Sequence, residues 1–199
     1  PTHIEKCVAK YTAMPNLGLV YTNSNLVLEK EQKIIHEDVS KFREGYIFDD
    51  LFLLNFWPKS GGFLFRTEIM KKVGGYNTSI WVEDFDYALR IAKDYPIGWV
   101  KEYLMFYRLH SSNIGGDSIR LLTALMDTLV QYQSYPLYPE AYARLESRLI
   151  AVSQTENPWY LLHKAIAKNS SRYLMAFIQA IIHKLKQYAK NIYHKYQSE

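Results

Sequence analysis

The pattern of apolar residues changes once along the chain, near Ile114, and this change limits what the chain can fold into. Before it, short apolar runs that suit strands alternate with helical segments, which predicts a mixed α/β region. After Gly115-Gly116, apolar residues recur at helical spacing to the end of the chain. We predict two domains, an α/β domain over residues 1–114 and a helical region over residues 115–199. Breaks between the later helices are predicted at Pro136, Pro139 and Pro158.

The α/β domain is predicted to hold several short elements. Strands are predicted over residues 17–22, 26–29, 63–65, 97–100 and 103–107, and helices over residues 2–11, 47–56, 67–73 and 84–95. Asn23-Ser24-Asn25 is interpreted as a polar turn between the first two strands. The first helix is expected to bury Ile4, Val8 and Tyr11, because they lie at helical spacing.

Positive charge is concentrated at the C-terminal end. The formal net charge is +4 and the pI is near 9.0. Residues 163–199 hold 7 Lys or Arg residues and a single acid, Glu199, so the rest of the chain has a slight negative charge. This distribution argues against a nucleic-acid surface spread over the whole protein and predicts a basic tail.

The single cysteine, Cys7, cannot form an internal disulfide and fits a reducing compartment. No apolar run reaches the roughly 18–20 residues that span a bilayer, and no secretory signal is visible. These features predict a cytoplasmic protein.

Five short motifs follow one another in order before residue 114. They are Gly61-Gly62-Phe63-Leu64-Phe65-Arg66, Val73-Gly74-Gly75-Tyr76, Val82-Glu83-Asp84-Phe85-Asp86-Tyr87-Ala88-Leu89-Arg90, Tyr95-Pro96-Ile97-Gly98 and Tyr107-Arg108-Leu109-His110-Ser111-Ser112-Asn113. The series resembles the second half of the catalytic domain of the inverting family-two nucleotide-sugar glycosyltransferases, which have the GT-A fold. The resemblance covers roughly residues 1–113.

The resemblance also implies what the chain lacks. In this family a nucleotide-binding half comes first and ends in an Asp-x-Asp motif, which holds the metal and the donor diphosphate. Pro1 and the residues after it look like the helix that follows that motif. We therefore expect a partial GT-A domain, inactive in isolation, whose full-length form uses Mn²⁺ or Mg²⁺. Asp84-x-Asp86 has the motif's spacing but lies in the Glu-Asp segment, and we do not interpret it as the metal motif.

The implied reaction is glycosyl transfer with inversion, in which an acceptor hydroxyl attacks the anomeric carbon of the donor sugar. A carboxylate that takes the hydroxyl proton accelerates such a step, and Asp84 matches the family's base. Glu83 would orient the acceptor or hold the loop. The alternative is that both acids only cap the predicted helix, whose free N–H groups favour carboxylates.

The last motif offers two more candidate site residues. The resemblance implies that His110 completes the metal site, although a single histidine is also commonly a packing residue. Arg108 would contact the departing diphosphate, or it forms a structural ion pair.

Glycines and tryptophans add further candidates for acceptor or donor binding. Gly61-Gly62 would bring the backbone close to a sugar, or it forms a tight turn into a strand. Trp57, Trp81 and Trp99 would offer stacking faces, although core burial is favoured for each; Trp81 is the first exception to expect, because it is close to Glu83-Asp84. The Gln-x-x-Arg-Trp motif of the processive members is absent from this sequence, which favours transfer of one sugar at a time.

The last predicted helix is amphipathic and basic. Its apolar residues are Leu174, Phe177, Ile178, Ile181, Ile182, Leu185, Tyr188 and Ile192, and its lysines are Lys184, Lys186, Lys190 and Lys195. Residues 170–199 would either lie on an anionic membrane surface at the inner face of the membrane or pack on the preceding helices.

Taken together, the sequence predicts a non-processive, metal-dependent glycosyltransferase that moves sugar from a nucleotide-sugar donor to a saccharide or lipid-linked acceptor. The family context implies bacterial-type surface polysaccharide or glycolipid synthesis. The alternative is a catalytically idle acceptor-binding or scaffold module. A nucleic-acid partner is not expected, since no nucleic-acid motif is present.

Overall fold

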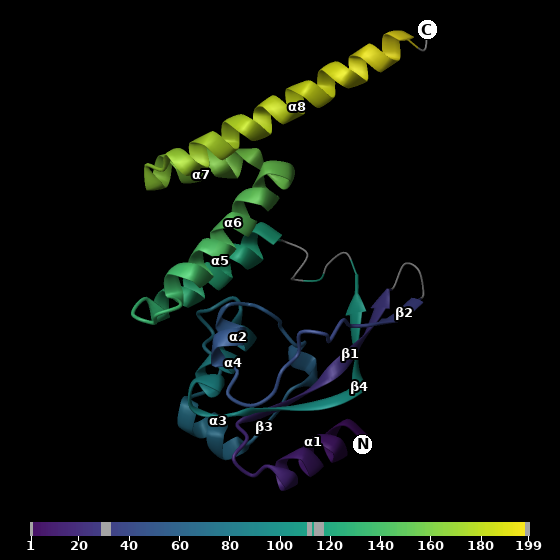
Figure 1. The fold of residues 1–199 in the computed structure, drawn as a ribbon, viewed down its shortest axis with the longest axis vertical. Helices are drawn as coiled ribbons and strands as arrows, with labels where there is room; N and C mark the ends of the chain where they lie inside the picture. The colour runs from purple at the N-terminus through teal and green to yellow at the C-terminus, as the bar shows by residue number, and fades with distance from the viewer. Residues whose placement is uncertain (1, 29–32, 111–112, 114–117, 198–199) are drawn as a thin grey trace. The chain divides into compact units, whose positions relative to one another are not determined.

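The structure, a computed structural model, describes residues 2–28, 33–110, 113 and 118–197, with side chains as far as Asn191. The described residues form an α/β sheet region and a helical region (Figure 1). They divide into two compact units, one of residues 1–116 with 124–142 and the other of residues 117–123 with 143–199. Ile114, where the sequence predicts the boundary, lies outside the described residues.

The α/β unit contains most of the elements. In chain order they are α1 (Thr2–Ala13), β1 (Leu19–Leu28), β2 (Lys33–His36), α2 (Phe48–Phe52), η1 (Ser60–Gly62), β3 (Leu64–Phe65), α3 (Thr67–Val73), α4 (Glu83–Asp94) and β4 (Ile97–Leu109). Parts of α5 (Ser118–Leu129) and α6 (Tyr138–Glu156) also belong to this unit, with η3 (Val130–Tyr132) between them.

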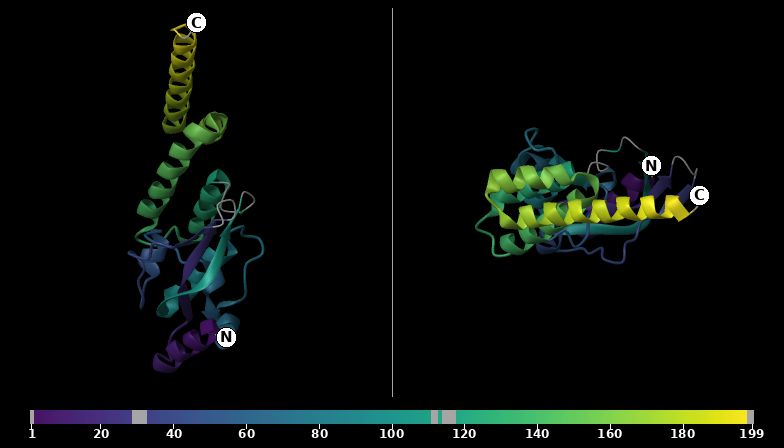
Figure 2. Two further views of the ribbon diagram at one scale, coloured as in Figure 1. Left: turned by 90° about the vertical axis from the view of Figure 1, so that its right-hand side faces the viewer. Right: turned by 90° about the horizontal axis from the view of Figure 1, so that it is seen from above.

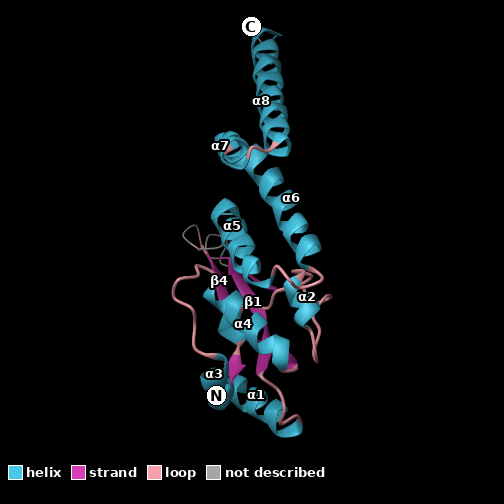
Figure 3. Cartoon of the chain, turned by 90° about the vertical axis from the view of Figure 1, so that its left-hand side faces the viewer, coloured by secondary structure: helices cyan, strands magenta, loops and turns pink. Residues whose placement is uncertain are grey.

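The four-stranded sheet is built around β1. One edge of β1 pairs in parallel with β4 along its whole length, from Leu19 opposite Ile97 to Leu28 opposite Leu109. The other edge pairs antiparallel with β3 at its start and with β2 at its end. Figure 3 shows β1 and β4 side by side, and α4 contacts β1. The fold is therefore α/β with a mixed sheet.

The predicted polar turn at residues 23–25 is wrong, because Asn23, Ser24 and Asn25 lie buried inside the continuous strand β1. Asn23 Oδ1 accepts a hydrogen bond from Trp99 Nε1 at 2.7 Å, and Asn25 Nδ2 donates to the Tyr103 carbonyl at 3.3 Å. These partners on β4 allow polar side chains to be buried. The two strands predicted over residues 97–107 are likewise one strand, β4, whose pairing shifts register beside Asn23.

Helix α1 packs on the sheet through only part of the predicted face, because Tyr11 is buried as expected and Ile4 and Val8 are not. Cys7 and Tyr11 are buried against Leu17 and Val20, whereas Ile4 and Val8 are 58% and 50% exposed. The Tyr11 hydroxyl donates to the Leu64 carbonyl at 2.8 Å, which fixes the rotation of the helix.

This packing predicts an unreactive thiol. Cys7 is fully buried, and burial raises its pKa to about 11. We expect Ellman's reagent to modify the native protein at least about a hundredfold more slowly than the urea-unfolded chain near pH 8. Because Cys7 is the single cysteine, the absorbance change reports this site alone. Equal rates in the two states would show that α1 does not pack on the sheet.

The helical unit comprises the later part of α6, α7 (Pro158–Lys168) and α8 (Ser171–Gln197), with the first turns of α5. Pro158 begins α7 as predicted, but Pro139 lies in the first turn of α6, where a missing N–H is tolerated. Asn169 has a left-handed backbone (φ 46°) that ends α7 and leads into α8. Within the described residues, none of the helices combines the length and apolar composition needed to cross a bilayer.

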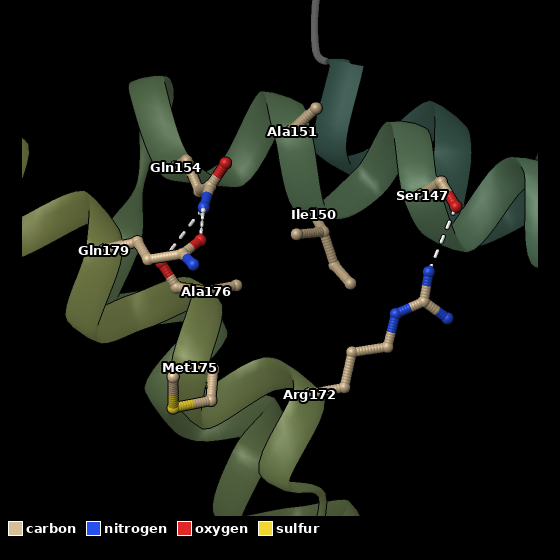
Figure 4. A pocket seen from close by; sticks show the side chains of 8 residues that line it. All are labelled: Ser147, Ile150, Ala151, Gln154, Arg172, Met175, Ala176 and Gln179. Atoms are coloured by element: carbon tan, nitrogen blue, oxygen red, sulfur yellow. Dashed lines mark hydrogen bonds between the residues drawn. The ribbon is translucent and has the colours of Figure 1, made fainter.

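Helices α7 and α8 pack through a small apolar core. It consists of Leu161 and Ala165 from α7 and Tyr173 and Ala176 from α8. A shallow groove runs between α6 and α8, and Gln154 crosses it to donate to the Ala176 carbonyl at 3.2 Å (Figure 4).

Candidate active site

The predicted catalytic carboxylates lie in the first turn of α4. Asp84 Oδ1 accepts a hydrogen bond from the backbone N–H of Phe85 at 2.8 Å, so this carboxylate does satisfy a free N–H of the helix. Within the described residues, the other oxygen, Oδ2, accepts no hydrogen bond. Asp84 is half-buried and Glu83 is exposed. One Asp84 oxygen is thus held by the helix and the other is available to a ligand.

The glycine-containing motif approaches this turn through aromatic contacts. The Trp57 ring lies 5.1 Å from the Phe85 ring and 6.0 Å from the Phe63 ring, centroid to centroid, in edge-to-face geometry. Phe63 directly follows η1, which holds Gly61 and Gly62. Trp57 therefore lies beside the start of α4 and links Phe63 to it.

The Val73–Tyr76 turn is tied to α4 by Arg90. The guanidinium of Arg90 donates to the carbonyls of Val73, Gly74 and Gly75 at 2.5, 3.1 and 2.8 Å. Gly74 has a positive φ of 75°, which a glycine adopts easily and which ends α3 as predicted. One side chain of α4 thus fixes the turn that precedes the carboxylates.

Arg90 is itself positioned from within α4. Its Nε donates to Asp86 Oδ2 at 2.9 Å, and the side chain of Asp86 is 1% exposed. The guanidinium also lies over the Tyr87 ring, 5.0 Å from its centroid. Asp86 thus has a structural role, as the partner of Arg90. Among the described residues, Asp84 and Asp86 do not belong to any group of side chains that could hold a metal ion.

Tyr76 lies close enough to the carboxylates to sense their charge. Its ring lies 4.7 Å from the Tyr87 ring. Burial raises the pKa of Tyr76, and the negative charges of Asp84 and Glu83 raise it further. Tyr76 therefore packs on α4 through Tyr87, and its phenol feels the charges of the two carboxylates.

The close backbone approach at Gly62 is to the sheet. A Cβ at Gly62 would lie 3.0 Å from Thr22 Oγ1 and 3.3 Å from the Thr22 carbonyl oxygen. His3 Nε2 also donates to the Gly62 carbonyl at 3.2 Å. Gly61 is exposed, and its Cβ would meet only the Met105 side chain, at 3.5 Å. Of the pair, Gly61 is the residue that a ligand can reach.

This difference predicts opposite outcomes for two alanine substitutions. We expect Gly62→Ala to lower the free energy of unfolding by roughly 1–2 kcal/mol, because the new methyl group crowds Thr22. Gly61→Ala, the matched control, should change it by less than about 0.5 kcal/mol. Urea denaturation of both variants measures the two values. Similar values for the two variants would contradict the packing of η1 against β1.

A partly buried carboxyl lies near the same segment. Burial raises the pKa of Glu37, and the ammonium group of Lys59, 4.0 Å away, opposes that effect. Lys59 directly precedes η1, and its ammonium group lies 5.3 Å from the centroid of the Tyr107 ring. The positively charged ammonium group of Lys59 thus lies near both Glu37 and Tyr107 of β4.

Arg108 and His110 lie at the end of β4. Asn113 organises their backbone, since its Oδ1 accepts the His110 N–H and its Nδ2 donates to the Arg108 carbonyl at 3.1 Å. Both side chains are exposed. In the described part of the chain, no group of three or more His, Cys, Asp or Glu side chains is placed to hold a metal ion. The described residues therefore do not build a metal site around His110.

The three candidate tryptophans differ in their surroundings. Trp99 is half-buried, stacks on Tyr21 with centroids 6.1 Å apart, and donates to Asn23. Trp57 is half-buried against Phe85. Trp81 is half-buried two residues before Glu83. Trp57 and Trp81 are thus the two tryptophans near the carboxylates.

Three residues of the site had no assigned role in the sequence analysis: Tyr76, Asp86 and Arg90. The spacing of Asp86 and Arg90 at i and i+4 on a predicted helix is a recognisable signal for an ion pair. The contacts from Arg90 to the turn and the proximity of Tyr76 to the carboxylates have no such signal, because loop geometry sets them.

The chain was also compared with models of protein families and with characterised proteins, and neither comparison finds a match.

Proposed function

We propose that the α/β unit is the acceptor-side half of an inverting, non-processive glycosyltransferase of GT-A type. The observation that carries the proposal is that three motif segments connect to the first two turns and a half of α4. Phe63 packs on Trp57, which packs on Phe85 in the first turn of α4. Arg90, further along the same helix, donates to carbonyls of the Val73–Tyr76 turn. The glycine-containing motif, the Val73–Tyr76 turn and the Glu-Asp segment, which carry the resemblance, are therefore all connected to α4, and this supports the proposal.

In the proposed reaction Asp84 is the general base. The acceptor hydroxyl transfers its proton to Oδ2 as its oxygen forms a bond to the anomeric carbon. The bond from that carbon to the diphosphate oxygen breaks, and its electron pair leaves with the nucleoside diphosphate. The Oδ1 bond to the Phe85 N–H fixes the orientation of the carboxylate during this step.

The remaining residues are proposed to bind the acceptor and the leaving group. Glu83 and Tyr76 would orient acceptor hydroxyls, and the half-buried Trp81 would provide an apolar sugar-contacting face. Arg108, exposed at the end of β4, would meet the departing diphosphate.

A nucleotide-sugar donor of this kind is ordinarily bound with Mn²⁺ or Mg²⁺, which neutralises the diphosphate. The described residues do not supply a metal-binding group. In the proposed enzyme a separate nucleotide-binding half supplies it, and His110 would be at most one additional ligand.

Binding of a UDP-sugar in the presence of Mn²⁺ tests the proposal. We expect calorimetric binding to a full-length form that includes the nucleotide-binding half, and little or none to residues 1–199 alone. Absence of binding by both, across UDP-, GDP- and dTDP-linked sugars, would overturn the proposed activity and favour an idle scaffold.

A further inference from the structure

We propose that α8 binds an anionic lipid bilayer through an exposed apolar face bordered by lysines. This face, called the α8 apolar face below, consists of Leu174, Ile178, Ile182, Leu185 and Tyr188. The inference is independent of the proposed glycosyl transfer.

The α8 apolar face is distinct from the side of the helix that packs inside the unit. Tyr173, Ala176 and Ala180 are buried on that packing side. The members of the α8 apolar face are between 41% and 67% exposed. The packing and the membrane interpretations of this helix thus apply to two different sides of it.

The second half of α8 has little of the unit around it. From Ile182 to Asn191 every described residue is exposed. Figures 1 and 2 show this half of α8 extending past the end of α7. A helix of this length exposes Leu185 and Tyr188 to water unless another surface covers them.

The positive charge of α8 favours a partner with a negative charge. Lys184, Lys186 and Lys190 are exposed on α8, and the sequence has no acidic residue between Glu156 and Glu199. At helical spacing Lys184 borders the Tyr188 side of the α8 apolar face, and Lys186 borders the Ile182 side. A second copy of the helix docked on this face would bring lysines together with no carboxylates to pair them.

A bilayer surface satisfies both features at once. The aliphatic side chains and the tyrosine would enter the boundary between headgroups and acyl chains, while the lysine stems extend their ammonium groups to lipid phosphates. Each lysine near an anionic surface adds to the binding, and this part weakens as salt is raised.

Vesicle flotation of the whole chain tests the proposal. Vesicles of phosphatidylcholine with phosphatidylglycerol should carry the protein upward in a density gradient, and vesicles of phosphatidylcholine alone should carry much less. Ile182→Gln with Leu185→Gln should lower the partition coefficient by about tenfold for each side chain. Lys184→Gln, Lys186→Gln and Lys190→Gln should lower it by about fivefold for each lysine.

Matched controls come from the α/β unit. Ile4→Gln removes a comparably exposed aliphatic side chain, and Lys41→Gln, Lys71→Gln and Lys93→Gln remove the same net charge. These controls should leave flotation unchanged, and far-ultraviolet circular dichroism should show that all variants keep their helices. Absence of flotation with anionic vesicles would overturn the proposal. So would an unchanged partition coefficient in the α8 variants. Self-association abolished by the Ile182 and Leu185 substitutions, without vesicle binding, would assign the face to a second copy instead.

Discussion

Replacing Asp84 with asparagine is expected to reduce the rate of sugar transfer by the proposed full-length glycosyltransferase by about 10²–10⁴-fold. The substitution removes the carboxylate proposed to take the acceptor proton and leaves the shape of the side chain nearly unchanged. The amide oxygen of asparagine can still accept the Phe85 N–H bond that Asp84 Oδ1 accepts at 2.8 Å. The free energy of unfolding should therefore change by less than about 1 kcal/mol. Steady-state kinetics and urea denaturation measure the two effects separately.

Glu83→Gln is the matched control for that experiment. Glu83 is the neighbouring acid and is exposed, so its substitution should raise KM for the acceptor more than it lowers kcat. Near-normal turnover of the Asp84→Asn variant would remove Asp84 from the role of base. An equal loss of kcat in both variants would show that the two acids act only through the electrostatics of the turn.

Replacing Arg90 with methionine is expected to have the largest effect on stability, a loss of roughly 2–4 kcal/mol. The substitution would leave the buried Asp86 carboxylate without its ion-pair partner, 2.9 Å away. It would also remove the donors to three carbonyls of the Val73–Gly75 segment. Urea denaturation monitored by circular dichroism gives the change directly.

Two further variants separate the ion pair from the contacts to the turn. Asp86→Asn combined with Arg90→Met should cost less than the sum of the two single substitutions, because the asparagine leaves no buried charge. Arg90→Lys keeps the charge but lacks the forked donor geometry, so its loss should be intermediate. A change below about 0.5 kcal/mol in Arg90→Met would show that the ion pair and the turn contacts do not hold this region together.

The elements best predicted from the sequence are those whose structure depends on residues within a few positions of one another. The helix predicted over residues 84–95 is confirmed as α4, and the predicted stop at Gly74 is confirmed by its positive φ. The turn predicted at residues 23–25 is wrong because the partners of Asn23 and Asn25, Trp99 and Tyr103, lie more than 70 residues away. Local polarity favours a turn there, and a long-range contact overrides it.

In the candidate site too, the features set by local sequence could be predicted and those set by long-range contacts could not. The positions of Asp84 and Glu83 at a helix start follow from the sequence, since acids before an apolar helical pattern favour that place. The approach of Gly62 to Thr22 does not follow from it, because nothing near a glycine in the sequence indicates which strand it will pack against. Arg90 shows why the turn and helix motifs occur together: one side chain on α4 hydrogen-bonds the turn.

The anomeric configuration of the product shows whether the protein is an inverting glycosyltransferase. The full-length enzyme would be incubated with an α-linked nucleotide sugar, Mn²⁺ and a saccharide acceptor, and the product examined by nuclear magnetic resonance. We expect a single β-linked sugar added per acceptor and the release of one nucleoside diphosphate, with both reduced by about 10²–10⁴-fold in Asp84→Asn. An α-linked product, or transfer at a near-normal rate by Asp84→Asn, would contradict the proposed mechanism.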